Sequence, residues 1–155
     1  MVEVVLVPMT PEAYVEFRRG VIRGYAASSV QARRWTAEEA PAASEKEIDG
    51  LLPKGVATPD HFLFTVHETE GGPKVGVLWV TKRKNEAFVY ELEIAEAHRG
   101  RGLGRATMLE AEKVARGFGA PRIGLHVFGT NATARALYKS LGYAETSVLM
   151  SKDLA

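Results

Sequence analysis

The sequence contains no cysteine. That absence excludes disulfide bonds, thiolate catalysis and metal sites with cysteine ligands. The 155 residues carry a formal net charge of only +1, so their overall charge provides no argument for a nucleic-acid or membrane partner. Long hydrophobic runs are also missing, because no stretch approaches the roughly 18 apolar residues that a transmembrane helix needs.

Internal repeats, low-complexity segments and long linkers are likewise absent. A chain of this length suits one domain with one core, so we expect a single domain over residues 1–155. The opening residues, MVEVVLVPMT, have a charge at position 3 and too short an apolar run for a signal peptide. With 46% hydrophobic and 25% charged residues, the chain is predicted to be a cytoplasmic globular protein.

The first half of the chain is predicted to form one strand, two helices and then three strands. The strands cover residues 2–7, 61–68, 75–82 and 87–95, and the helices cover residue 10 to about residue 25 or beyond, and residues 36–52. Thr10 followed by Pro11 is typical of a helix start, since the hydroxyl caps the first turn and proline fits the first helical position. Capping-box patterns beginning at Thr36 and Ser44 predict the second helical segment, which Pro41 is expected to interrupt or restart.

The second half of the chain alternates helices with strands. The helices cover residues 102–118 and 131–141, and the strands cover residues 122–128 and 143–150. A strand, a crossover helix and a second strand between residues 87 and 128 imply one parallel strand pair. We therefore predict an α/β fold with a mixed, mostly antiparallel central sheet and helices on both faces. A parallel pair that splays apart would leave a slot for a ligand.

A loop rich in glycine and arginine, RGRGLGR at residues 99–105, joins a predicted strand to a predicted helix. Gly100, Gly102 and Gly104 let the backbone approach a ligand closely. A helix N-terminus offers unpaired N–H groups and the positive end of the helix dipole. The intervening arginines add planar guanidinium groups that match phosphate oxygens. The loop therefore predicts a ligand that carries phosphate.

Two common phosphate loops do not fit these residues. The dinucleotide pattern G-x-G-x-x-G fails, because Arg105 and Thr107 stand where the third glycine is required. The nucleoside-triphosphate pattern G-x-x-x-x-G-K-[ST] is absent. What remains is Arg99-x-x-Gly102-x-Gly104, and a plain glycine-rich turn with solvated arginines is the alternative interpretation.

Residues 99–104 resemble the R/Q-x-x-G-x-G/A acyl-CoA pyrophosphate loop of the GNAT superfamily of N-acetyltransferases. Residues 131–143, NATARALYKSLGY, are similar to the family's N-x-x-A-x-x-L-Y-x-x-x-G-F/Y helix. The two motifs occur in the family's order and at a family-like separation. The resemblance implies a GNAT-like fold, acetyl-CoA as cosubstrate and direct transfer of the acetyl group to an amine. We expect no metal.

The resemblance also implies which residues hold acetyl-CoA. Backbone N–H groups of the loop would bind the pyrophosphate, and the main chain at the end of the preceding strand would bind the pantetheine arm. The expected cofactor-binding residues are Leu92, Glu93, Ile94, Arg99, Gly100, Arg101, Gly102, Leu103, Gly104, Arg105, Asn131 and Tyr138.

The motif match makes Tyr138 the expected acid that protonates the leaving thiolate. Tyr138 follows Asn131 by seven residues, so both lie on one helix face. A phenol titrates near 10 and is therefore protonated at neutral pH. Without the motif, Tyr138 would be interpreted as a core residue and Asn131 as an ordinary helix cap.

Three residues are candidates for the base that deprotonates the amine. His126, expected on the strand before the last helix, can accept a proton at neutral pH. Glu91 and Glu93 are expected to share the strand face opposite Tyr90 and Leu92. The residues alone leave the choice among the three open.

The acceptor is the least defined part of the prediction. A small-molecule amine and a protein N-terminus both remain open, as does a homodimer. Tyr25, Trp35, Trp79 and Phe128 are expected either to line a pocket or to pack in the core, and residues 26–59 are hypothesised to form a lid. The alternative functions are a catalytically inactive acyl-CoA-binding regulatory domain and a protein that binds another nucleotide.

Overall fold

The computed structural model describes residues 2–155. Within them the elements are β1 (Val5–Pro8), α1 (Pro11–Gln31), α2 (Ala40–Leu51), β2 (His61–His67), β3 (Lys74–Lys82), β4 (Ala87–Ile94), α3 (Leu103–Gly117), β5 (Ile123–Leu125) and α4 (Ala132–Ser140). The strands form one sheet in chain order, in which β1 to β4 are antiparallel and β5 runs parallel to β4. The predicted mixed sheet with one parallel pair is confirmed.

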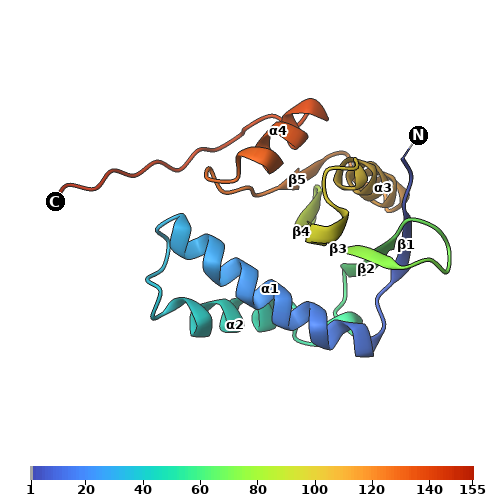
Figure 1. Cartoon of the computed structure of the whole chain (residues 1–155), viewed down its shortest axis with the longest axis horizontal. Coiled ribbons are helices and arrows are strands. Elements are labelled where there is room, and N and C mark those ends of the chain that lie inside the picture. Colours follow the sequence, from blue (N-terminus) through green and yellow to red (C-terminus); the bar gives the residue numbers. More distant parts are fainter. Residues whose placement is uncertain (1) are drawn as a thin grey trace.

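Helices cover both faces of this sheet (Figure 1). On one face, Phe17 of α1 and Ile48 of α2 are buried against Trp79 of β3. On the other face, Met108 of α3 is buried against the sheet, and Tyr138 of α4 packs at the edge of the same cluster. The sheet is therefore the middle layer of the molecule, as the sequence predicted.

Helix α1 begins as its sequence predicts. The Thr10 hydroxyl accepts a hydrogen bond from the Ala13 N–H at 3.1 Å, and Pro11 occupies the first helical position. The helix extends to Gln31, in agreement with a predicted end at about residue 25 or beyond. Its apolar face is buried on the sheet, where the ring centroids of Phe17 and Trp79 lie 6.1 Å apart.

Helix α2 differs from the prediction in one detail, the role of Ser44. The first capping box forms: the Glu39 N–H donates to the Thr36 hydroxyl at 3.2 Å, and the Glu39 carboxylate accepts from the Thr36 N–H at 2.9 Å. Pro41 then lies in the first turn, where its ring is tolerated, so of the two predicted outcomes it is the start of a helix that Pro41 marks. Ser44 is no cap, because its buried hydroxyl donates to the Ile22 carbonyl at 2.7 Å and joins α2 to α1.

A β-bulge interrupts the pairing of β3 with β4. Trp79 pairs with Glu91 and the next residue of β3 pairs with Val89, which leaves Tyr90 as an extra residue. Tyr90 therefore turns to the face of Trp79, where the two rings stack with centroids 4.6 Å apart, while Leu92 packs on the other face. The prediction that Tyr90 shares a face with Leu92 is wrong, because the bulge breaks the alternation.

The end of the chain also departs from the prediction. The strand predicted over residues 143–150 is wrong: residues 144–155 form an extended tail with no assigned strand or helix, which leaves the body of the molecule beyond α4 (Figure 1). The strand predicted over residues 122–128 is shortened to β5, so His126 lies beyond its end.

Two further findings concern residues 2–155. None of their helices combines the length and the apolar character that crossing a bilayer requires. No three of their histidine, aspartate or glutamate side chains gather closely enough to hold a metal ion.

Candidate active site

The sheet opens between β4 and β5. The two strands pair at three positions only, from Ala87 with Ile123 to Val89 with Leu125. Beyond Val89, β4 continues to Ile94 while β5 has ended. The main chain of β4 therefore faces an opening there, at the place where the sequence predicted a ligand slot.

The loop at residues 99–105 leads from this opening into α3. Gly100 and Gly102 have φ values of +80° and +81°, which residues with a Cβ seldom adopt. Gly102 is the N-cap of α3 and provides no side-chain oxygen for the first turn, which also lacks an acidic residue. The first N–H groups of α3 are therefore available to an anionic ligand.

The arginines of this loop have partners in the protein. Arg99 donates from Nε to the Ile94 carbonyl at 2.8 Å, Arg101 forms an ion pair with Glu68 at 2.7 Å, and Arg105 donates to the Ser140 hydroxyl at 3.1 Å. These contacts fasten the loop to the end of β4, to the turn after β2 and to α4. Because the guanidinium groups are already paired within the protein, a bound phosphate would contact mainly the backbone of the loop.

Glu91 is half-buried on β4, beside the opening. Burial raises the pKa of its carboxyl to about 7, and the nearby charge of Glu93 acts in the same direction. A hydrogen bond with the Leu92 backbone lowers the pKa of the Glu91 carboxyl, but it offsets only part of the increase. Glu91 is therefore a carboxylate that can take up a proton near neutral pH.

Tyr138 is half-buried on α4. Burial raises the pKa of its phenol, and the negative charge of Glu91 raises it further. The phenol therefore stays protonated and can donate a proton. Glu91 of β4 and Tyr138 of α4 are therefore near enough for the charge of the carboxylate to affect the phenol.

His126 and Glu93 are placed differently. His126 is exposed, and its ring meets Phe128 edge to face with centroids 4.8 Å apart. Among residues 2–155, no hydrogen bond or ion pair joins His126 to Glu91 or Tyr138. Glu93 is exposed opposite Val77 and acts on the site through its effect on the pKa of Glu91.

The remaining predicted cofactor residues lie around the same opening. Ile94 is buried and Leu92 is half-buried in the core. Since their side chains pack in the core, only their main-chain groups can bind a ligand. Asn131 caps α4, where its Oδ1 accepts from the Ala134 N–H at 3.1 Å. A Cβ on Gly104 would lie 3.5 Å from Leu137, which shows how closely the start of α3 approaches α4.

Three of the aromatic residues considered for the acceptor side gather at one place. The Tyr25 ring lies 5.5 Å from the Trp35 ring and 6.4 Å from the Phe128 ring, measured between centroids. The Tyr25 hydroxyl donates to Glu47 at 3.1 Å, and the Arg34 guanidinium lies 4.6 Å from the Trp35 ring centroid. The sequence carried no signal for Arg34 and Glu47, because ion pairs between distant segments leave no local pattern.

Trp79, in contrast, is only 1% exposed and belongs to the core. Its indole N–H donates to Nδ1 of His61 at 2.9 Å, which satisfies its one polar atom. The lid hypothesis for residues 26–59 stays a prediction. Much of that segment is α2, which packs firmly on α1.

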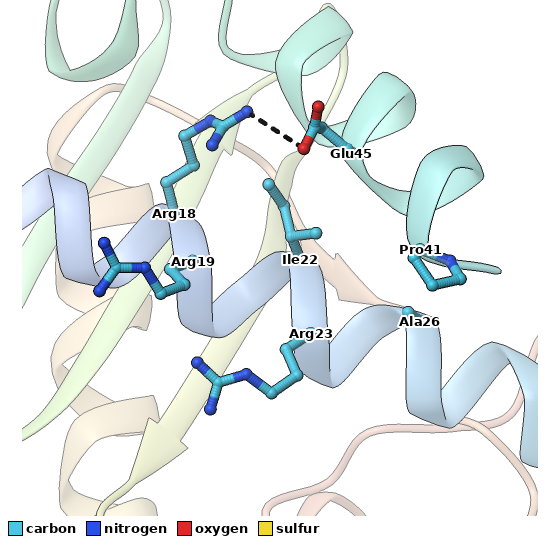
Figure 2. A pocket seen from close by; sticks show the side chains of 7 residues that line it. All are labelled: Arg18, Arg19, Ile22, Arg23, Ala26, Pro41 and Glu45. Carbon is cyan, nitrogen blue, oxygen red and sulfur yellow. Dashed lines mark ion pairs between the residues drawn. The ribbon is translucent and has the colours of Figure 1, made fainter.

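A groove between α1 and α2 has a volume of about 320 Å³ (Figure 2). Arg18 points across it to α2, where the guanidinium lies 3.9 Å from Glu45 and 2.6 Å from Asp49. None of the predicted site residues lines this groove. The groove is therefore separate from the residues that the sequence predicted for the site.

The chain matches the family model described as the Acetyltransferase (GNAT) family over residues 29–143. The chain belongs to the GNAT family of acetyltransferases. The matched span includes the loop at residues 99–105 and helix α4, the two segments that carry the resemblance in the sequence.

Two relatives of this GNAT protein are the uncharacterized N-acetyltransferases YycN and YdgE of Bacillus subtilis (strain 168). YycN is 35% identical over 155 residues, which cover 97% of this chain and 99% of the relative. YdgE is 33% identical over 150 residues, which cover 94% of this chain and 95% of the relative.

Solved structures agree with this assignment. The crystal structure of YycN matches with a TM-score of 0.93 and covers 98% of this chain and 99% of its own. A GCN5-related N-acetyltransferase from Ralstonia eutropha JMP134 has the same fold at 23% identity, with a TM-score of 0.67 and coverage of 97% and 98%.

Proposed function

We propose that this GNAT protein transfers an acetyl group from acetyl-CoA to a primary amine. In this proposal the amine attacks the thioester directly, in a ternary complex, within a single acetyltransferase domain formed by residues 1–155. The observation that supports the proposal is that the pKa of the Glu91 carboxyl is raised to about 7 and that its charge acts on the Tyr138 phenol, in a chain whose α3 begins without a side-chain cap.

The loop and strand β4 would hold the cosubstrate. Backbone N–H groups at residues 100–105 suit the pyrophosphate, since they combine an uncapped helix start with left-handed glycines. The main chain of β4 beyond Val89 lacks β5 as a partner, so its N–H and C=O groups suit the amide groups of the pantetheine arm. Bound acetyl-CoA would supply the thioester.

Glu91 would act as the base and Tyr138 as the acid. Glu91 takes a proton from the ammonium form of the acceptor, directly or through a water molecule, and leaves a nucleophilic amine. As the new C–N bond forms and the C–S bond breaks, the Tyr138 phenol donates its proton to the departing sulfur, and the nitrogen loses its second proton to solvent to give the neutral amide. Solvent then reprotonates the phenolate and receives the proton from Glu91, which restores both groups. Glu91 is preferred over His126 and Glu93 because its pKa is about 7 and its charge acts on Tyr138.

The acceptor side favours a cationic amine. Glu91 and Glu93 provide negative charge that attracts an ammonium group, whereas the Tyr25 and Trp35 rings already carry the Arg34 guanidinium, 5.6 and 4.6 Å from their centroids. A small-molecule amine and a protein N-terminus both meet this description.

An acetylation assay tests the proposal. The protein is incubated with acetyl-CoA and a panel of polyamines, amino acids, aminoglycosides and peptides, while release of CoA thiol and the mass of the product are followed. Tyr138→Phe should reduce kcat by about 10²-fold or more, because it removes the proton donor, and should leave CoA affinity close to that of the wild type. Tight CoA binding without turnover of any amine would contradict the proposal and favour the inactive acyl-CoA-binding domain.

A further inference from the structure

A hydrogen bond in the core determines the protonation state of His61. Trp79 is fully buried, and its indole N–H donates to Nδ1 of His61 at 2.9 Å. Within residues 2–155 the His61 ring makes no other hydrogen bond. An indole nitrogen can only donate, so Nδ1 must lack a proton. The His61 ring is therefore neutral and carries its proton on Nε2.

Protonation of His61 is incompatible with this contact. A proton on Nδ1 would face the indole N–H of Trp79, and burial leaves that N–H no water as an alternative partner. Burial lowers the pKa of the His61 imidazole, the Asp60 carboxylate opposes this change, and the Arg83 guanidinium adds to it, so the net shift is downward. The ring is therefore neutral at physiological pH and takes up a proton only at acidic pH.

The backbone just before His61 is strained. Asp60 has a φ of +64°, which is uncommon for residues other than glycine. Its carbonyl accepts from the Thr81 hydroxyl at 2.7 Å and from the Lys82 N–H at 2.8 Å. Strain of this kind persists only where the surrounding contacts impose it, and it occurs mostly at functional sites. These contacts fix His61 at the start of β2, within reach of the indole.

The Trp79 ring connects His61 to the bulge in β4. It stacks on the Tyr90 ring with centroids 4.6 Å apart, and the His61 ring stacks on the same tyrosine with centroids 6.0 Å apart. The Tyr90 hydroxyl accepts from the Arg83 guanidinium at 3.0 Å. Tyr90 is the extra residue of the bulge, and the next residue, Glu91, pairs with Trp79. The packing of these rings therefore holds the bulge in place.

The bulge determines the direction of the Glu91 side chain. A bulge redirects the side chains of the strand that contains it, and a shift of one residue in register turns a side chain to the opposite face of a sheet. If Tyr90 left the Trp79 ring and β4 returned to regular alternation, Glu91 would lose its present orientation. The orientation of Glu91 therefore depends on the stacking of Tyr90.

We infer that His61 is a positioning residue for Glu91 and acts through Trp79 and Tyr90. The neutral His61 ring holds the indole, the indole holds the Tyr90 ring, and that ring holds the bulge that orients Glu91. Protonation of His61 releases the indole and lets the bulge relax. The inference rests on the proposed function for its role in catalysis, because Glu91 is the base there. The contacts themselves are testable without acetyl transfer.

An NMR titration of the isotope-labelled full chain tests the link from His61 to Trp79. In the wild type, the Trp79 indole N–H resonance should shift at acidic pH as His61 takes up a proton. In His61→Asn this shift should vanish, because the side-chain oxygen accepts the indole N–H and does not titrate. The second tryptophan, Trp35, is an internal reference that should behave alike in both proteins. A Trp79 resonance that titrates equally in both would overturn the inference.

The link to Glu91 is measured on its carboxyl carbon, also by NMR. His61→Leu removes the acceptor, and the titration midpoint of Glu91 should fall toward that of an ordinary glutamate, because a relaxed bulge lets water reach the carboxyl. His61→Asn should keep the wild-type midpoint. His67→Asn is the matched control, since His67 lies at the other end of β2 and contacts the Gly72 carbonyl. A midpoint that is the same in wild type and His61→Leu would overturn the inference.

Acetylation kinetics separate this inference from the proposed function. His61→Leu should lower kcat by up to about 10²-fold, the effect of a misplaced catalytic group, and should leave KM for acetyl-CoA unchanged. His61→Asn should restore kcat, which a general loss of stability would not predict. An active enzyme with equal kcat in wild type and His61→Leu would overturn the inference. A wild type that transfers no acetyl group would contradict the proposed function, while the two titrations would still decide whether His61 positions Glu91.

Discussion

The protonation state of Glu91 should determine how the rate of the proposed acetyl transfer depends on pH. The base must be ionised to accept a proton, and the carboxyl of Glu91 has a pKa of about 7. We therefore expect kcat/KM to rise with pH through about 7 and then level off. Glu91→Gln should lower the rate and remove this acidic limb, whereas His126→Ala should retain it. A limb lost in His126→Ala and kept in Glu91→Gln would identify His126 as the base.

The same carboxyl should affect folding stability. Its pKa is raised from 4.5 to about 7 in the folded protein, so the folded state binds this proton more tightly than the unfolded state. The stabilisation is fully present below the unfolded pKa and is lost as pH rises through about 7. Well above that pH, Glu91→Gln should be more stable than the wild type by up to about 3 kcal/mol. At acidic pH the difference should nearly vanish. Denaturant unfolding of both proteins at the two pH extremes measures the effect, and a difference independent of pH would contradict it.

At the scale of elements, the start of α3 depends on the backbone conformation of Gly102. Its φ is +81°, and a Cβ there would meet Val2 at an ordinary 3.7 Å. The cost of Gly102→Ala is therefore conformational, about 1–2 kcal/mol for the left-handed backbone, and the loop should relax and misplace its N–H groups. CoA affinity measured by calorimetry should fall by about tenfold, since 1.4 kcal/mol corresponds to that factor.

Two variants control this experiment. Gly102→Asn should retain more CoA affinity than Gly102→Ala, because asparagine tolerates a positive φ better. Gly117→Ala lies near the other end of α3, where a Cβ would meet nothing within 4 Å, so CoA affinity should not change. Equal affinity for wild type and Gly102→Ala would remove the loop from the cofactor site.

Local signals in the sequence predicted most elements and part of the site. The caps at Thr10 and Asn131 form as expected, because a cap is determined by residues within one turn. The bulge at Tyr90 was missed, since it depends on the pairing of β3 with β4. The tail was predicted as a strand from its own residues, but strand formation also requires a neighbour. The ranking of Glu91 above His126 likewise depended on burial, which arises from elements distant in the chain.

For the whole molecule, the order of strands in the sheet has a consequence for folding kinetics. Strands β2, β3 and β4 are neighbours both in the chain and in the sheet, so the chain between their contacts is short and they should form early. Strand β5 reaches the sheet only after the chain has passed through α3, and it pairs with β4 at only three positions. We expect pulse-labelling hydrogen exchange to protect the amides of β2–β4 before those of β5. Simultaneous protection would contradict this order. In such a pathway the opening beside β4 is the last part of the molecule to take shape.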